Sequence, residues 1–187
     1  MIKRLLVVML TVVMLTSLAV AKEIGGVKLP DSLTVGEETL LLNGAGLRKR
    51  LFVKVYAGAL YLMQKTTDPQ TIIESDVPMA VRMHFIYDGV SAKKLVDAWN
   101  EGFGNATDGN LAPIKREINQ FNACFTQEAK KDDIYDIIYV PGQGTRVVMK
   151  GNVVDTIEGL DFKKALFSIW FGKRPADTGL KEGMLGQ

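Results

Sequence analysis

The sequence predicts an α+β fold, an antiparallel β-sheet covered on one face by a layer of helices. Strand patterns come first along the chain, followed by two helices, three further strands and a last helix. The three later strands are separated by residues 141–144 and 150–152, which contain the glycine, proline and asparagine typical of antiparallel turns. Each helical pattern carries one apolar stripe that a sheet can cover. Links of hairpin length argue against a doubly wound parallel sheet.

The strands before the first helix are predicted from their alternation and their residue types. Residues 27–29 predict a short opening strand. Residues 49–62 predict a long strand, because they are rich in β-branched and aromatic residues and contain no proline. Residues 71–74 predict a helical turn, and residues 79–86 predict another strand. We expect the sheet to be built around the long strand.

Two helices are expected in the middle of the chain. Ser91 is a candidate N-cap for the first, and Leu95, Trp99 and Phe103 recur at four-residue intervals along its apolar stripe. Pro113 suits the first turn of the second helix. We expect both stripes to form core rather than to contact a cofactor.

The last third of the chain returns to strands and ends in a helix. Residues 134–140, 145–149 and 152–157 predict three strands joined by the turns named above. Asp161 is expected to cap the last helix, and Gly172 is expected to end it.

One face of the long strand has a composition that suits ligand binding. Alternation makes the opposite face almost wholly apolar, whereas this one places Lys54 and Tyr56 among apolar neighbours, shortly after Arg48. A guanidinium stays protonated and can hold a carboxylate or a phenolate by two hydrogen bonds. These residues suit a ligand with an anionic head and an apolar body. Alternatively, Arg48 pairs with a protein acid, or lies exposed beside Lys49 and Arg50 in a solvated turn.

Three glycines near this strand, Gly44, Gly46 and Gly58, indicate places where the backbone bends or another segment approaches closely. The Gly-Ala-Gly-hydrophobic-Arg turn of residues 44–48 is followed by Phe-Val-Lys-x-x-Ala-x-x-x-Tyr-Leu in residues 52–62. This combination resembles the start of the chalcone isomerase fold. The chain is similar to bacterial chalcone isomerase-like proteins from about residue 26 to about residue 172. The resemblance implies an open-faced β-sandwich with Arg48 at the base of a ligand cleft, where it would polarise substrate oxygens.

The resemblance does not extend to the other catalytic groups of the family's isomerases. Tyr56 falls where those enzymes have a threonine, and the groups that orient substrate and water fall near Val90, Asp97 and Ala176. We therefore assign no catalytic residue, except Arg48 if the protein is an enzyme, and expect no chalcone cyclisation. In fatty-acid-binding relatives of this fold, an arginine and a strand tyrosine hold a carboxylate, and Arg48 with Tyr56 resembles that pattern.

Three functions remain as hypotheses. The leading one is an exported, non-catalytic protein that binds a small amphipathic anion, such as a fatty acid, in a cleft between sheet and helices, through Arg48, Tyr56 and Lys54. The second is an intramolecular isomerase or lyase of chalcone isomerase type, with Arg48 stabilising an enolate or phenolate. The third is a protein-interaction module of the envelope, whose cleft is filled by side chains.

The sequence predicts neither a cofactor nor a metal site. Residues 44–46 lack the third glycine and the βαβ context of a dinucleotide site. His84 is the only histidine, and without a second histidine or a cysteine pair we expect a structural strand residue. Cys124 is the only cysteine, which excludes an intramolecular disulfide, and we expect a small buried hydrophobe there.

The first 21 residues differ from the rest. Lys3 and Arg4 precede an apolar run at residues 5–18, and residues 19–21 are the small residues of a cleavage site. We expect a signal peptide at residues 1–21, one domain at residues 22–187, and a periplasmic or secreted protein with no stable membrane insertion after cleavage. Removing Lys3 and Arg4 leaves the basic residues equal in number to the 21 acidic ones, so nucleic acid is not an expected partner.

The processed protein is therefore expected to begin at Lys22. N-terminal sequencing of exported material checks this prediction. Protein that still begins at Met1, or that remains with membranes after a carbonate wash, would contradict it.

Overall fold

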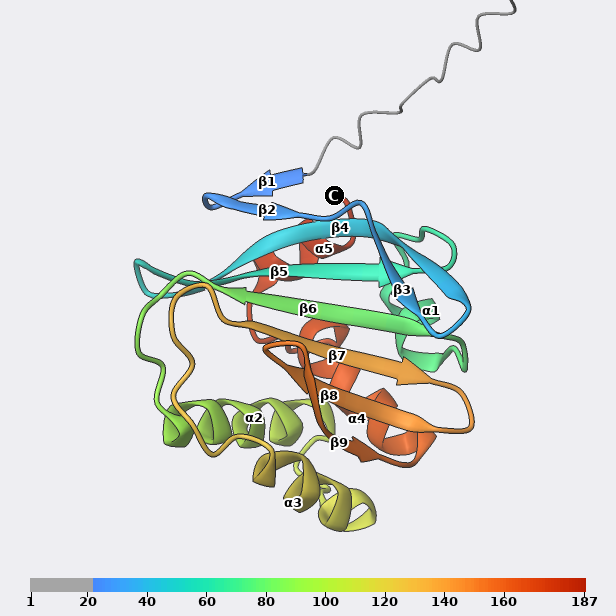
Figure 1. Ribbon diagram of the computed structural model, residues 1–187. Coiled ribbons are helices and arrows are strands. Elements are labelled where there is room, and N and C mark those ends of the chain that lie inside the picture. The colour runs from blue at the N-terminus through green and yellow to red at the C-terminus, as the bar shows by residue number, and fades with distance from the viewer. Residues whose placement is uncertain (1–21) are drawn as a thin grey trace, which may run out of the picture.

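A computed structural model describes residues 22–187, so the signal peptide expected at residues 1–21 lies outside the described residues. The described chain forms a seven-stranded antiparallel sheet in the order β3-β4-β5-β6-β7-β8-β9, and β1 and β2 form a separate hairpin. Figure 1 shows a curled sheet with the long helices packed on one side. The elements are β1 (Lys22–Ile24), β2 (Val27–Leu29), β3 (Ser32–Val35), β4 (Glu38–Arg50), β5 (Val53–Leu62), α1 (Pro69–Glu74), β6 (Met79–Phe85), α2 (Ala92–Ala106), the 3-10 helix η1 (Ala112–Ile114), α3 (Lys115–Ala123), β7 (Ile134–Val140), β8 (Gly144–Met149), β9 (Asn152–Ile157), α4 (Leu160–Phe171) and α5 (Thr178–Met184). The predicted α+β class is confirmed.

The sheet has two apolar faces because side chains alternate along its strands. In β5, Tyr56 and Leu60 belong to the apolar cluster that the helices cover. Ala57, Ala59 and Tyr61 belong to a second cluster on the opposite face, which includes residues of β2 and β3. The predicted separation of the two faces is confirmed from Tyr56 onwards.

Aromatic side chains fill the space between the sheet and the helices. The Trp99 ring of α2 lies 5.2 Å from the Phe121 ring of α3 and 5.6 Å from the Trp170 ring of α4, measured between ring centroids. Both contacts are edge-to-face, the arrangement that aromatic quadrupoles favour. The helical stripes predicted from the sequence therefore form core, and Ser91 caps α2 by accepting a hydrogen bond from the Lys94 amide.

The long strand predicted at residues 49–62 is wrong at its start, and so is the turn predicted at residues 44–48. Residues 44–48 lie inside β4, which pairs with β5 across a turn at Leu51 and Phe52. Leu51 has φ +54°, a conformation usually taken by glycine or asparagine in such hairpins. The sequence carries neither residue at this turn, and its apolar, β-branched composition resembles an uninterrupted strand.

Two features of the C-terminal region also differ from expectation. Helix α4 begins at Leu160 with Gly159 at its N-cap, so Asp161 lies in the first turn and does not cap the helix. Its position still complements the helix dipole. Helix α5 was not predicted, because its seven residues include two glycines, which are poor helix formers. Asp177 caps this helix by accepting a hydrogen bond from the Leu180 amide. Gly172 ends α4 as predicted.

Lys163 of α4 is fully buried and joins α4 to the end of α1. Its ammonium donates hydrogen bonds to the carbonyls of Ile72, Ile73 and Ser75, with Nζ–O distances of 2.7, 2.9 and 2.7 Å. These carbonyls belong to the C-terminal end of α1, where helical carbonyls lack partners within the helix. Burial lowers the pKa of Lys163 to about 8, against the opposing effect of nearby Asp76.

Lys163→Met is expected to lower the free energy of unfolding at pH 7 by about 2–4 kcal/mol, because buried carbonyls lose their donors. The unfolded chain binds more protons than the folded chain between the folded pKa of about 8 and the ordinary lysine value near 10. The stability of the wild type relative to Lys163→Met should therefore rise across this pH range. Denaturant titrations at pH 7, 8.5 and 10 check both effects.

The control variant is Lys164→Met. This neighbouring lysine is partly exposed and pairs with Glu74 at the surface. Its loss should cost much less than that of Lys163, because surface ion pairs contribute little. Equal losses for the two variants would contradict the role given to Lys163.

Candidate functional site

Arg48 and Tyr56 lie directly opposite each other on β4 and β5. Paired residues of antiparallel strands point to the same face of the sheet, and here it is the face that the helices cover. The sheet register becomes irregular immediately after Arg48, and the next pair is Lys49 with Lys54. The structure thus brings together two of the three residues that the sequence singled out.

The same face of β4 and β5 carries the three glycines noted in the sequence, and α5 packs on them. A Cβ atom at Gly46 would lie 2.8 Å from the Leu180 carbonyl oxygen, and one at Gly58 would lie 2.7 Å from Cδ1 of Leu180. A Cβ at Gly44 would overlap the carbonyl oxygen of Gly183. The close approach predicted at these glycines is confirmed: the backbone of α5 and its flanks approaches Gly44 and Gly46, and the Leu180 side chain approaches Gly58.

Asp177 connects α5 to the end of β4. One carboxylate oxygen caps α5, and the other accepts a hydrogen bond from the Lys49 amide at 2.9 Å. This second oxygen also lies 3.5 Å from Nη1 of Arg48, and both side chains are only 17% exposed. That distance is longer than the 2.7–2.9 Å typical of a charge-assisted hydrogen bond. Arg48 therefore faces a protein carboxylate but is held loosely by it.

The rest of the Arg48 guanidinium is available. Nη1 donates a hydrogen bond to the Lys49 carbonyl at 2.6 Å. Within residues 22–187, Nε and Nη2 of Arg48 make no hydrogen bond. The planar group therefore retains donors for a further anion.

The Tyr56 hydroxyl is buried beside Arg48. It accepts a hydrogen bond from the Trp170 indole at 3.1 Å, and its ring centroid lies 5.7 Å from that of Phe85. Burial raises the pKa of Tyr56 above its usual value, although nearby Arg48 opposes this rise. The phenol therefore stays protonated at neutral pH and retains a hydrogen that it can donate.

Lys54 does not belong to this group. It is exposed near the β4–β5 turn, and its cross-strand neighbour is Lys49. The expectation that Lys54 lies among apolar neighbours is wrong, because the turn at Leu51 and Phe52 places the start of β5 at the exposed end of the sheet.

The positions that correspond to the enzymes' polar groups do not converge on Arg48. Asp97 lies on the surface of α2 and pairs with Lys93 at 2.7 Å. Val90 packs at the edge of the core, where its backbone pairs with that of Ala129. Ala176 is adjacent to Asp177, but its side chain is apolar. None of these three positions supplies an acid or a base to the guanidinium, and the carboxylate that faces it is that of Asp177.

His84 lies on β6, with its Nε2 atom 3.5 Å from a carboxylate oxygen of Asp132. In the described residues, no group of three or more histidine, cysteine, aspartate or glutamate side chains has the arrangement of a metal site. Cys124 is buried, as expected, and burial raises the pKa of its thiol to about 11.

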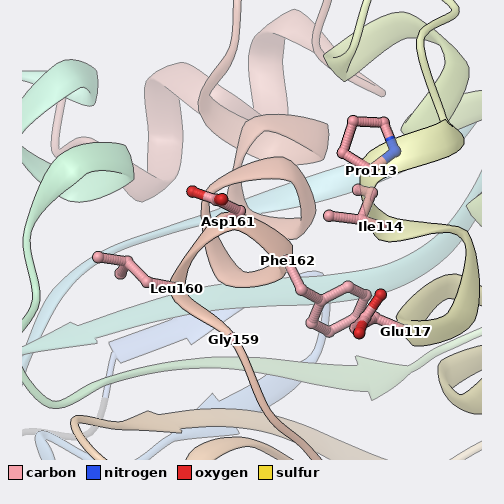
Figure 2. A pocket seen from close by; sticks show the side chains of 7 residues that line it. All are labelled: Pro113, Ile114, Glu117, Gly159, Leu160, Asp161 and Phe162. Carbon is pink, nitrogen blue, oxygen red and sulfur yellow. The ribbon is translucent and has the colours of Figure 1, made fainter.

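Two surface hollows lie away from Arg48. One, of about 240 Å³, lies between η1–α3 and the start of α4, and Figure 2 shows Glu117 and Asp161 among its lining side chains. Leu160 at this hollow and Trp170 beside Tyr56 are ten residues apart on α4, or about 15 Å along a helix. The other, of about 320 Å³, contains Arg82 already paired with Asp136. Glu117 and Asp161 make the first hollow unsuited to an anionic ligand, whereas the lining of the second is mixed, with Arg82 and Lys150 beside three aspartates.

Two residues important to the site were missed by sequence reasoning. Asp177 precedes a short glycine-containing segment, and its capping role was the signal that could have located it. Trp170 was assigned only to an apolar stripe, although a buried indole usually has a hydrogen-bond acceptor.

None of the helices in residues 22–187 has both the length and the apolar character needed to cross a bilayer.

The antiparallel sheet with helices on one face is a class of fold that a known structure shares. The crystal structure of a fatty-acid-binding protein from Arabidopsis thaliana superposes with a TM-score of 0.70, covering 86% of this chain and 92% of that one. The two sequences are 20% identical, so the likeness shows the fold alone.

Sequence comparison gives the family. The model of the chalcone isomerase-like family matches residues 21–186, and the chain belongs to that family. Fatty-acid-binding protein 1 of Arabidopsis thaliana is 23% identical over 117 residues, which are 61% of this chain and 42% of that protein. The chain thus matches less than half the length of this relative.

Gly46→Ala is expected to lower the free energy of unfolding by about 1–3 kcal/mol, because the new methyl group would press on the α5 backbone. Gly104→Ala in α2 is the control, since its Cβ would have no neighbour within 4 Å and alanine favours a helix. Denaturant unfolding of both variants checks this prediction. If Gly46→Ala left the free energy of unfolding unchanged, that result would contradict the close packing of α5 on β4.

Proposed function

We propose that this chain is a non-catalytic member of the chalcone isomerase-like family that binds a small amphipathic anion, such as a fatty acid. Arg48 and Tyr56 would hold the anionic head, and the apolar body would lie between the sheet and the helices. The observation that carries the proposal is the pairing of Arg48 with Tyr56 on the helix-covered face, with guanidinium and phenol donors still available.

The chemistry of these two residues matches a carboxylate. Arg48 can offer two parallel N–H donors, and the protonated phenol of Tyr56 can offer a third hydrogen bond. Tyr56 is buried and the Arg48 side chain is 17% exposed, and hydrogen bonds partly shielded from water are stronger than those at an exposed surface.

Asp177 is the protein carboxylate that faces Arg48. Its loose contact with Arg48 means that a ligand carboxylate with two hydrogen bonds could replace it. Because side chains fill the interior, the ligand's apolar body requires α5 and its buried Leu180 and Met184 to move. We propose that α5 closes the site when no ligand is bound and shifts when one enters.

The comparisons support this proposal at the level of the family. Both comparisons lead to fatty-acid-binding protein 1 of Arabidopsis thaliana, whose solved chain shares this fold over 92% of its length. The positions that carry polar groups in the family's enzymes, Val90, Asp97 and Ala176, supply no acid or base to Arg48, so the proposal includes no catalytic step. The expected signal peptide adds a further proposal, that the protein works in the periplasm or outside the cell.

Arg48→Ala should weaken fatty-acid binding by about 2–5 kcal/mol, because it removes one partner of a desolvated charge pair. Arg48→Lys should recover only part of this loss, since an ammonium cannot make the two-pronged contact. Tyr56→Phe should cost about 1 kcal/mol, the contribution of one hydrogen bond. Isothermal titration calorimetry with a medium-chain and a long-chain fatty acid measures these effects.

Two further variants complete the series: Lys54→Ala is a control, and Asp177→Asn tests the competing carboxylate. Lys54→Ala should leave the affinity unchanged, since Lys54 is exposed away from the pair. Asp177→Asn should raise the affinity, because it removes the negative charge that competes for Arg48. Melting temperatures without ligand must accompany the titrations. If Arg48→Ala strongly lowers the melting temperature but leaves the affinity unchanged, Arg48 is structural and the proposed site is wrong.

A further inference from the structure

The turn between β4 and β5 presents two large apolar side chains to solvent. The side chains belong to Leu51 and Phe52, which are 89% and 100% exposed. The turn lies at one end of the sheet, on the side where the chain also leaves β6 (Figure 1). Hairpin turns usually carry polar residues or glycine, and here a leucine takes a backbone conformation that favours glycine. Burial within this domain does not explain either side chain.

The residues that flank the turn are basic. Lys49 and Arg50 precede it, Lys54 follows it, and all three are exposed. The chain has no acidic residue between Glu38 and Asp68. Within residues 22–187, none of the three cations forms an ion pair with a carboxylate. The end of the hairpin is therefore a local concentration of positive charge on a chain whose overall charge is small.

A second exposed aromatic residue lies near the base of this hairpin. Tyr87 is 45% exposed, and its amide donates a hydrogen bond to the Val55 carbonyl at 3.1 Å. Tyrosine is enriched where apolar and aqueous environments meet, because its ring is apolar and its hydroxyl is polar. The hairpin thus has an apolar end, a cationic region behind it and a tyrosine beside its base.

We propose that the β4–β5 hairpin docks on the surface of an anionic lipid bilayer. Leu51 and Phe52 would enter the boundary between headgroups and acyl chains, and Lys49, Arg50 and Lys54 would contact the anionic headgroups. A bilayer fits better than a protein partner, because the apolar side chains lie on a projecting turn with cations directly behind them. This proposal does not depend on ligand binding at Arg48, although docking would place that site close to a lipid surface.

The test uses residues 22–187, which contain every described element and both apolar clusters but lack the apolar run of residues 5–18, which could bind lipid by itself. Flotation and sedimentation are measured with phosphatidylcholine vesicles and with vesicles containing about 30% phosphatidylglycerol. We expect binding to the anionic vesicles that falls as salt is raised. The double variant Leu51→Ser and Phe52→Ser should bind these vesicles at least about tenfold more weakly than the wild type.

Matched variants distinguish docking through the β4–β5 hairpin from nonspecific binding to vesicles. Val153→Ser with Val154→Ser removes two exposed apolar side chains from β9 and should bind as the wild type does. Arg50→Gln with Lys54→Gln should weaken binding to anionic vesicles, whereas Lys94→Gln with Lys115→Gln on the helices should not. Phe52→Trp should show a blue shift of its emission on adding anionic vesicles, since Trp99 and Trp170 are already buried.

Three results would overturn the proposal. One is no vesicle binding by the wild type, and another is equal binding by the wild type and the Leu51→Ser and Phe52→Ser variant. The third is a dimer, in analytical ultracentrifugation without lipid, that this double variant converts to a monomer, since the turn would then be a contact between two copies of the chain.

Discussion

The packing of α5 directly on β4 and β5 is the contact on which the proposed site depends. Gly44 and Gly46 lack the side chains that would hold the helix away, so the backbones of helix and strand meet closely, and Gly58 leaves room for the Leu180 side chain. Gly183 contributes from the helix side, where a Cβ would lie 2.6 Å from the Ala45 carbonyl oxygen. Close backbone contact of this kind tolerates almost no added volume, because protein interiors are packed as densely as organic crystals.

This packing also determines the electrostatics around Arg48. The helix begins at Asp177, and its cap carboxylate is brought to the end of β4 because α5 lies along that strand. Because Arg48 is held only loosely by Asp177 beneath this short helix, a competing anion can displace the Asp177 carboxylate. Lys163, at the end of α4 far from Trp170, is buried and has three carbonyl partners, so this lysine has a structural role. Arg48 differs from Lys163 because part of its guanidinium has no hydrogen-bond partner in residues 22–187.

Much of the fold was predictable because its elements are defined by local patterns. The stripe through Leu95, Trp99 and Phe103 is buried as predicted, and the turns at residues 141–144 and 150–152 join antiparallel strands. The β4–β5 turn was missed because Leu51, which has a positive φ there, is not one of the residue types typical of such turns. Helix α5 was missed because a helix of seven residues with two glycines is stabilised by tertiary packing rather than by intrinsic propensity.

The candidate site shows the same division. The sequence by itself determined that an arginine and a strand tyrosine are close along the chain, that three glycines admit a neighbouring segment, and that no metal-binding or cysteine–histidine pattern is present. Only the tertiary structure decided that Arg48 and Tyr56 are cross-strand neighbours, that Lys54 is separated from them, and that Asp177 faces the guanidinium. The physical reason is that pairing register and contacts across more than a hundred residues depend on how strands and helices pack, and no local pattern records that packing.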